Sequence, residues 1–207
     1  MTTTRSRQAL MSASALVLIT GAVACGSSGN DALPPTSSWQ QGQTQQQTQK
    51  APVLSAGQTL SIKTTPIQLA TPIPAGSADV TLVSVTEAKT LPSKTGVTTK
   101  IAPDEEFAVL TFKVKNTGED KFDTYVLDQA RWTGEDGYAV NAGNAVFTDH
   151  EPGTAVPYPA FHNQVNPMPG EFVLGTSVLV IPATQPGTLH FTDRNGNPLF
   201  DVATKGK

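Results

Sequence analysis

The stretch Glu106-Phe-Ala-Val-Leu-Thr-Phe-Lys-Val-Lys-Asn116 alternates clearly between two kinds of side chain. A period of two is that of a β-strand, whose successive side chains point to opposite faces. One face carries only apolar side chains: Ala108, Leu110, Phe112 and Val114. We therefore predict a strand with this face in a core. On the other face we expect Phe107 and Val109 to lie under a neighbouring loop, and the alternative is an exposed binding patch.

Turn-forming residues divide the rest of this region into further short strands. The sequences Asn116-Thr-Gly118, Gly134-Glu-Asp-Gly137 and Asn195-Gly196 accept the φ values of tight turns. The predicted strands are residues 78–85, 125–133, 171–182, 187–193 and 198–202, and a short edge strand fits residues 59–63. The chain has 17 Gly and 16 Pro with 6% aromatic residues, which suits a turn-rich β protein. We predict an all-β fold, an antiparallel sandwich of immunoglobulin-like type.

The sequence also predicts the local structure around several residues in or near these strands. Gly175 should mark a bulge or a close approach by another part of the chain. His190 alternates with the inward Leu189 and Phe191, so it should face outward. Asp193–Asn197 has some character of a calcium-binding loop, but a hairpin turn explains it better. The predicted loops are residues 91–99 and the Pro-rich residues 151–170, and the second is long enough to be functional.

The first 24 residues have the pattern of an export signal. Arg5 and Arg7 precede an uncharged stretch from Ala9 to Ala24, and no acidic residue occurs before Asp31. The stretch is shorter than the roughly 18 to 20 apolar residues of a spanning helix and is diluted by serine and threonine. We predict a signal peptide over residues 1–24 rather than a permanent transmembrane helix.

Ala22-Val-Ala-Cys25 resembles the lipobox of bacterial lipoproteins, with Ala22 where Leu is usual. The resemblance implies that Cys25 receives a diacylglyceryl thioether and becomes the mature amino terminus. Cys25 is the only cysteine, whereas an exported domain held by disulfides carries an even number. The predicted location is the extracytoplasmic face of the cell membrane, through a lipid on Cys25. Ordinary cleavage near Ala24, which gives a secreted protein, is the alternative.

Residues 25–75 are rich in Gln, Ser, Thr and Pro, and Gln40–Gln49 alone contains seven glutamines. Such a segment cannot bury enough apolar surface to offset its ordering entropy, so we predict a disordered tether with an end-to-end distance of roughly 40 Å. A glycosylated or wall-interacting segment is the alternative. The predicted division is therefore a signal peptide over residues 1–24, a tether over 25–75 and a sandwich domain over 76–207.

Composition and motifs argue against several classes of function. The net charge is -3, and the predicted mature part has no cluster of Lys and Arg, so nucleic acid is not an expected partner. The chain has no Gly-x-Ser-x-Gly motif, no cysteine nucleophile besides Cys25 and no Gly-rich phosphate loop after a strand. We expect neither enzymatic activity nor a cofactor.

A metal site is the least improbable chemistry in the sequence. His150 and His162 lie in or beside the Pro-rich loop, and Met168 follows them. The acidic neighbours are Asp149 and Glu151. Imidazole with thioether favours copper, and imidazole with carboxylate favours zinc. Because exposed loop histidines are usually only solvated, an extracytoplasmic metal-binding lipoprotein is the alternative hypothesis.

The order of several short motifs resembles one family. The motifs are Phe107-x-Val-x-x-Phe112-x-Val-x-Asn116-Thr-Gly, Asp136-Gly-Tyr138, Pro169-Gly-Glu171 with Gly175, and Ile181-Pro182. Together they look like the uncharacterised immunoglobulin-like domains displayed by bacterial lipoproteins, which are similar to the mycobacterial immunoprotective antigen. The resemblance spans about residues 78–203 and implies an extracellular sandwich without established catalytic residues. The leading hypothesis is thus a non-catalytic surface module that recognises a protein or envelope component through loops or a sheet edge.

Overall fold

The structure is a computed structural model that describes residues 50–91, 99–143, 156 and 158–206. Its strands are β1 (Thr59–Lys63), β2 (Ser77–Ala88), β3 (Thr90–Leu91), β4 (Thr99–Lys100), β5 (Glu105–Asn116), β6 (Ala130–Gly134), β7 (Ala139–Ala142), β8 (Phe172–Pro182), β9 (Gly187–Thr192) and β10 (Pro198–Thr204). Two 3₁₀ helices, η1 (Thr124–Leu127) and η2 (Phe161–Asn163), lie between strands. None of the helices in the described ranges is long and apolar enough to span a bilayer.

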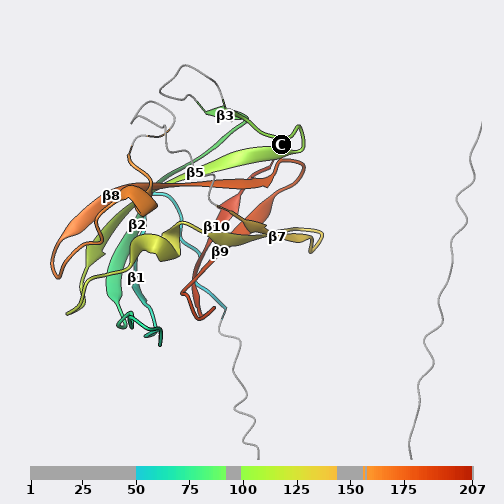
Figure 1. Ribbon diagram of the computed structural model, residues 1–207. Helices are drawn as coiled ribbons and strands as arrows, with labels where there is room; N and C mark the ends of the chain where they lie inside the picture. The colour runs from blue at the N-terminus through green and yellow to red at the C-terminus, as the bar shows by residue number, and fades with distance from the viewer. Residues whose placement is uncertain (1–49, 92–98, 144–155, 157, 207) are drawn as a thin grey trace, which may run out of the picture. The chain divides into compact units, whose positions relative to one another are not determined.

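Two four-stranded antiparallel sheets face each other (Figure 1). One has the order β1-β2-β5-β8 and the other the order β10-β9-β6-β7, while β3 and β4 form a separate pair. β5 is central to the first sheet, because it pairs along most of its length with β2 on one side and β8 on the other. This arrangement confirms the predicted antiparallel sandwich of immunoglobulin-like type.

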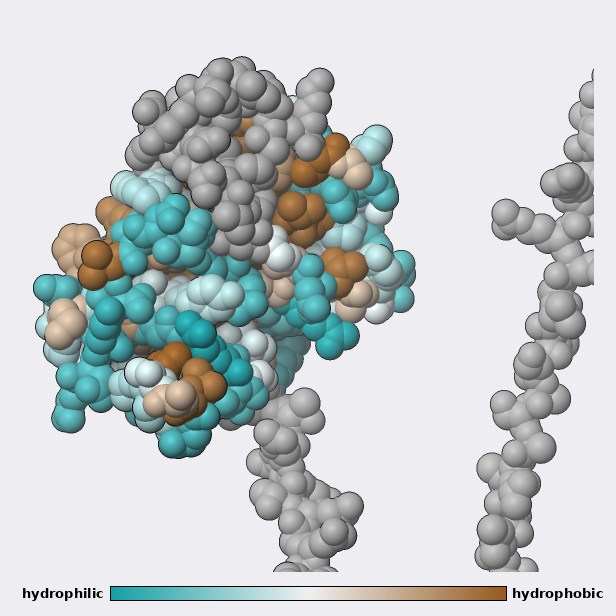
Figure 2. All heavy atoms as spheres, in the orientation of Figure 1, coloured by the Kyte–Doolittle hydropathy of each residue, from teal (hydrophilic) through white to brown (hydrophobic). Residues whose placement is uncertain are grey.

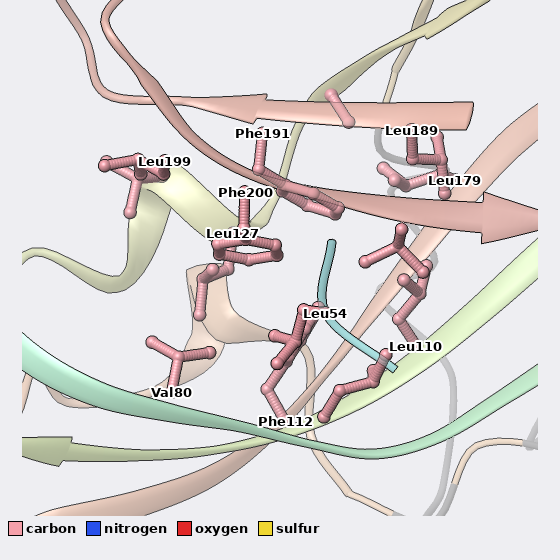
Figure 3. Packing of buried hydrophobic residues seen from close by; sticks show 14 of the residues in the cluster. Leu54, Val80, Leu110, Phe112, Leu127, Leu179, Leu189, Phe191, Leu199 and Phe200 are labelled. Atoms are coloured by element: carbon pink, nitrogen blue, oxygen red, sulfur yellow. The ribbon is translucent and has the colours of Figure 1, made fainter. Parts of the chain in front are cut away.

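The two sheets enclose a core of phenylalanine rings. The ring centroid of Phe112 on β5 lies 5.8 Å from that of Phe191 on β9 and 6.0 Å from that of Phe200 on β10. Figure 3 shows these rings between the sheets, with Leu54 among them. The four residues predicted to face inward from β5 are all buried, which confirms the predicted face. Full burial of side chains of this kind contributes about 1.5 to 3 kcal/mol each.

A second apolar cluster covers the other face of β5. Phe107 and Val109 pack with Leu91 of β3, with Val156 and with Val178 of β8, and both are buried. The expected cover is thus confirmed, and these two residues do not form an exposed patch. The predicted loop at residues 91–99 connects the paired strands β3 and β4. Its residues 92–98 lie outside the described part.

The folded part begins before residue 76, where the predicted tether ends. A segment ahead of β1 runs parallel to β10, and the N–H of Leu54 donates to the C=O of Asp201 at 2.8 Å. β1 then pairs with β2 as the edge strand that fits residues 59–63. Leu54 and Ile62 are both buried in the main core. The boundary at residue 76 is therefore corrected: the second half of the predicted tether closes one side of the sandwich.

The predicted strand at residues 125–133 is wrong in its first half, which forms η1. The side chain of Asp123 caps η1 by accepting a hydrogen bond from the N–H of Tyr125 at 3.1 Å. The side-chain oxygen of Asn166 accepts hydrogen bonds from the N–H and the hydroxyl of Thr124, at 3.0 and 2.7 Å. Side-chain bonds to the backbone of this kind compete with strand pairing, so β6 starts only afterwards.

Gly175 on β8 is a site of close approach, as predicted. A Cβ atom at this position would lie 2.4 Å from Cε1 of Phe161 on η2. The ring of Phe161 in turn lies 6.2 Å from that of Phe112, measured between centroids. The glycine is therefore required by the contact that attaches η2 to the sheet. The remaining predicted strands, at residues 78–85, 171–182, 187–193 and 198–202, are confirmed with small shifts at their ends.

Candidate functional site

The turns of the sandwich gather at two opposite ends. The β9–β10 turn and Lys50 share one end, because the segment ahead of β1 runs parallel to β10 from its start. We call this end the Lys50 pole. The β6–β7 turn and the β8–β9 turn lie at the other end, which we call the Tyr138 pole (Figure 1).

A groove of about 580 Å³ lies between the two sheets toward the Tyr138 pole. β7 and β8 are the last strands of their sheets, and the groove lies where these strands approach each other. Within the described residues, the N–H of Val180 on β8 donates to the C=O of Gly143, directly after β7, at 3.4 Å. The lining includes Asp104, Glu105, Tyr138, Val140, Val180 and Pro182.

The groove combines an apolar lining with acidic residues. Val140 and Val180 supply aliphatic surface, and the Tyr138 side chain is 56% exposed. The carboxylates of Asp104 and Glu105 have no ion-pair partner within the described part of the chain. Apolar clefts with a few polar groups are typical of ligand sites, and this charge favours a cationic group on the ligand.

The residues of the predicted metal site are only partly described. His162 lies beside Asp128, with 3.6 Å between Nδ1 and Oδ2. Asp128 is buried, and burial raises the pKa of its carboxyl to about 7. Met168 is 51% exposed, and the described residues contain no group of three or more His, Cys, Asp or Glu that could hold a metal ion. His150, Asp149 and Glu151 lie outside the described residues, as does Cys25, so their roles stay predictions.

His190 faces outward, as predicted. Its Nδ1 lies 2.8 Å from Oδ1 of Asp201 on the neighbouring β10. On its other side His190 is paired in register with Arg131 of β6. This polar row belongs to the outer face of the second sheet, and antiparallel sheets commonly face water on one side.

The segment Asp193–Asn197 forms the predicted hairpin turn. Oδ1 of Asp193 accepts hydrogen bonds from the N–H groups of Asn195 and Asn197, both at 2.9 Å, and Gly196 has a φ of 82°. Burial works against the ionised form of Asp193, but hydrogen bonds from Asn197 and Thr65 outweigh it and lower the pKa of this carboxyl to about 2. The oxygens of Asp193 are therefore used within the fold.

The sequence did not reveal the groove. Its lining comes from the chain before β5, from the β6–β7 hairpin and from the end of β8, which are far apart in sequence. In the sequence, Tyr138 belongs only to the Asp136-Gly-Tyr138 motif of the family resemblance. The one available signal was a large aromatic residue directly after a tight Asp-Gly turn, where core residues are not expected.

The chain resembles known proteins in its three-dimensional structure. No family model and no curated protein matches the chain. An uncharacterized β-sandwich protein from Clostridium difficile is 15% identical, with 75% of this chain and 95% of that chain covered and a TM-score of 0.46. A "putative lipoprotein" from Staphylococcus aureus is 9% identical, with coverages of 70% and 93% and a TM-score of 0.45. A second "putative lipoprotein", from Bacillus subtilis, is 15% identical, with coverages of 73% and 39% and a TM-score of 0.40. The resemblance to the mycobacterial antigen stays a prediction.

Proposed function

We propose that the chain is a lipid-anchored protein of the extracytoplasmic membrane face that presents a non-catalytic sandwich to a binding partner. The anchor is the diacylglyceryl group predicted on Cys25. The observation that carries the binding role is the position of the groove, which lies toward the Tyr138 pole. The chain from Cys25 reaches the sandwich at the opposite end, at Lys50. A partner in the groove therefore binds at the end away from the anchor.

The partner that fits the groove is an extended segment of an envelope or surface protein. Its backbone can add to the outer edge of β7, which is the last strand of its sheet. Its apolar side chains contact Val140 and Val180, and a Lys or Arg side chain reaches Asp104 or Glu105. The sequence contains no nucleophile–base motif, so we assign the groove no catalytic role.

Crosslinking on intact cells tests the binding role. A photo-crosslinking amino acid at position 138 should capture a discrete partner. The same amino acid at position 131, exposed on the outer face of the second sheet, should not. Charge reversal at Asp104 and Glu105 together should abolish capture from position 138. Equal capture from positions 138 and 131, or capture that survives charge reversal, would remove the groove as the partner site.

Detergent phase partitioning tests the anchor. The wild-type chain should enter the detergent phase, and the Cys25→Ala variant should remain in the aqueous phase because it cannot form the thioether. Equal distribution of the two proteins would leave the sandwich without its proposed anchor.

A further inference from the structure

The loop between β1 and β2 is a closed hairpin at the Lys50 pole, and we call residues 64–76 the finger. The N–H of Ile67 donates to the C=O of Ile73 at 2.9 Å, and the N–H of Ile73 donates back to the C=O of Ile67 at 3.1 Å. At its base, the N–H of Thr64 donates to the C=O of Gly76 at 2.9 Å, and the N–H of Gly76 donates to the hydroxyl of Thr64 at 2.9 Å. The finger is therefore held together along its length.

The base of the finger is also fixed to the second sheet. The N–H and the hydroxyl of Thr65 both donate to Oδ2 of Asp193, and Nδ2 of Asn195 donates to the C=O of Pro66 at 3.1 Å. A Cβ at Gly76 would lie 2.9 Å from the ring of Phe122, so the finger leaves the sandwich in close contact with the core. These contacts keep its tip directed away from the sheets.

The finger carries no charge and has an apolar tip. No charged residue occurs between Lys63 and Asp79. Leu69 is 57% exposed, and its neighbours Gln68 and Ala70 are also exposed. Brown, hydrophobic atoms lie at the lower end of the visible face in Figure 2, where Figure 1 places the loop below β1. The finger therefore presents one exposed large apolar side chain on a hairpin that carries no charge.

The arms of the finger, on either side of residues 68–71, have few unpaired backbone donors. Pro66, Pro72 and Pro74 have no N–H, and the N–H groups of Ile67 and Ile73 are already paired. Fewer backbone donors of the arms then lose hydrogen bonds to water when the finger approaches an apolar phase. A backbone donor that loses water without gaining another partner costs free energy in an apolar medium.

The finger lies at the pole that the anchor reaches. Residues 26–49 are all that separate Cys25 from Lys50, which is about half of the predicted tether. A polar coil of that length, as the sequence predicts for this segment, spans roughly 25 to 30 Å on average. With the proposed lipid on Cys25, a coil of this length would keep the Lys50 pole near the bilayer, at a high effective concentration of lipid.

We propose that the finger inserts Leu69 and its neighbours into the interface of the bilayer that carries the anchor. The inference rests on the proposed lipid on Cys25, because the anchor supplies the proximity that a single small apolar tip requires. The insertion is driven by burial of apolar surface, so it does not depend on attraction between charges. It holds the sandwich upright, with the groove directed away from the membrane.

Site-directed fluorescence on the anchored full-length protein tests the proposal. In the lipidated chain the sulfur of Cys25 is blocked, so Leu69→Cys introduces the only free thiol. An environment-sensitive fluorophore is attached there, and the protein is reconstituted into phosphatidylethanolamine–phosphatidylglycerol vesicles that contain a nitroxide-labelled lipid. Glu135→Cys, exposed in the turn at the Tyr138 pole, is the matched control.

We expect the lipid nitroxide to quench the fluorophore at position 69 severalfold more than the fluorophore at position 135. The quenching should persist in about 1 M NaCl, where the Debye length is about 3 Å. Equal quenching at the two positions would overturn the proposal, and so would loss of the difference in high salt. If a thiol at position 69 is protected from maleimide labelling on cells but not on pure vesicles, the finger contacts a protein partner instead.

Maleimide labelling of the wild-type chain tests the proposed anchor separately from the insertion of the finger. A lipidated Cys25 takes up no maleimide, whereas a free Cys25 is fully labelled and the anchor is then disproved. In that case the Cys25→Ala, Leu69→Cys variant is mixed with the same vesicles. Quenching at position 69 would still support insertion of the finger, and its absence would reject it.

Discussion

Thr65 donates two hydrogen bonds to one carboxylate oxygen of Asp193, from its N–H at 3.0 Å and from its hydroxyl at 2.7 Å. The two residues are 128 positions apart in the sequence. Thr65 lies in the finger just after β1, and Asp193 directly follows β9, so this contact joins the two sheets at the Lys50 pole. The same carboxylate organises the β9–β10 turn through Asn195 and Asn197.

Asp193→Asn should lower the free energy of unfolding by about 1 to 3 kcal/mol, because the amide has one acceptor oxygen for bonds now shared by two. Urea unfolding measures the change. Asp136→Asn is the matched control, since Asp136 also caps its turn, through the N–H of Tyr138 at 2.9 Å, but is exposed. A loss no larger than that of the control would show that the contact with Thr65 contributes little.

Asp193 should also make the fold sensitive to acid. Its pKa falls from the usual 3.8 to about 2 in the folded state. A lowered pKa means that the ionised form stabilises the fold, so this contribution is complete above about pH 4 and is lost as the pH falls toward 2. We expect a loss of about 1 to 2 kcal/mol over this window, allowing for solvent screening. The profile of Asp193→Asn should be flatter, and an unchanged profile would contradict the assignment.

Asp128 should have the opposite effect on the pH profile. Burial raises its pKa from 3.8 to about 7 in the folded state. The folded state then binds the proton more tightly than the unfolded state, so stability from this group is complete below about pH 4 and falls as the pH rises to 7. Asp128→Asn should increase stability at pH 8 by about 2 kcal/mol and leave it unchanged at pH 4. A variant that is less stable at pH 8 would indicate that Asp128 is ionised and paired with His162.

Gly175→Ala should destabilise the sandwich by about 1 to 3 kcal/mol, because the new methyl group overlaps the ring of Phe161. Thermal or urea unfolding measures the loss. Gly143→Ala is the control, since a Cβ there meets nothing within 4 Å. Combining Gly175→Ala with Phe161→Leu should recover part of the loss. If the two substitutions are additive, the close approach is not the cause.

Phe107→Ala should cost about 3 to 5 kcal/mol, as expected for a fully buried ring, although Phe107 lies outside the space between the sheets. Tyr138→Ala, which removes an exposed ring, should change stability by less than about 0.5 kcal/mol. Urea unfolding curves of the two variants measure both changes. Similar small losses at the two positions would mean that the outer cluster is only loosely packed.

The strand at residues 106–116 could be predicted because its alternation is a local property of the sequence. The turns at Asp136-Gly137 and Asn195-Gly196 could be predicted for the same reason, and Gly137 and Gly196 indeed have φ values of 83° and 82°. Local patterns of this kind determine where strands end. They do not determine which strands become neighbours.

The features that could not be predicted depend on distant partners. Leu54 lies in a segment with the composition of a linker, and its place in the core depends on pairing with Asp201. Thr124 has a β-branched side chain, but its bonds to Asn166 favour a 3₁₀ turn. The groove likewise exists only because the last strands of two sheets approach each other, which no local pattern encodes.

The parallel segment ahead of β1 determines how the sandwich responds to mechanical force. A pull on Lys50 directed away from the Tyr138 pole acts along the axis of β10. The N–H of Leu54 and the C=O of Pro52, both bonded to Asp201, then carry the load in shear at the same time. Hydrogen bonds loaded together resist extension better than bonds that are peeled apart one after another. With the proposed partner at the Tyr138 pole and the proposed lipid on Cys25, drag on the partner would load these two hydrogen bonds together rather than one after the other.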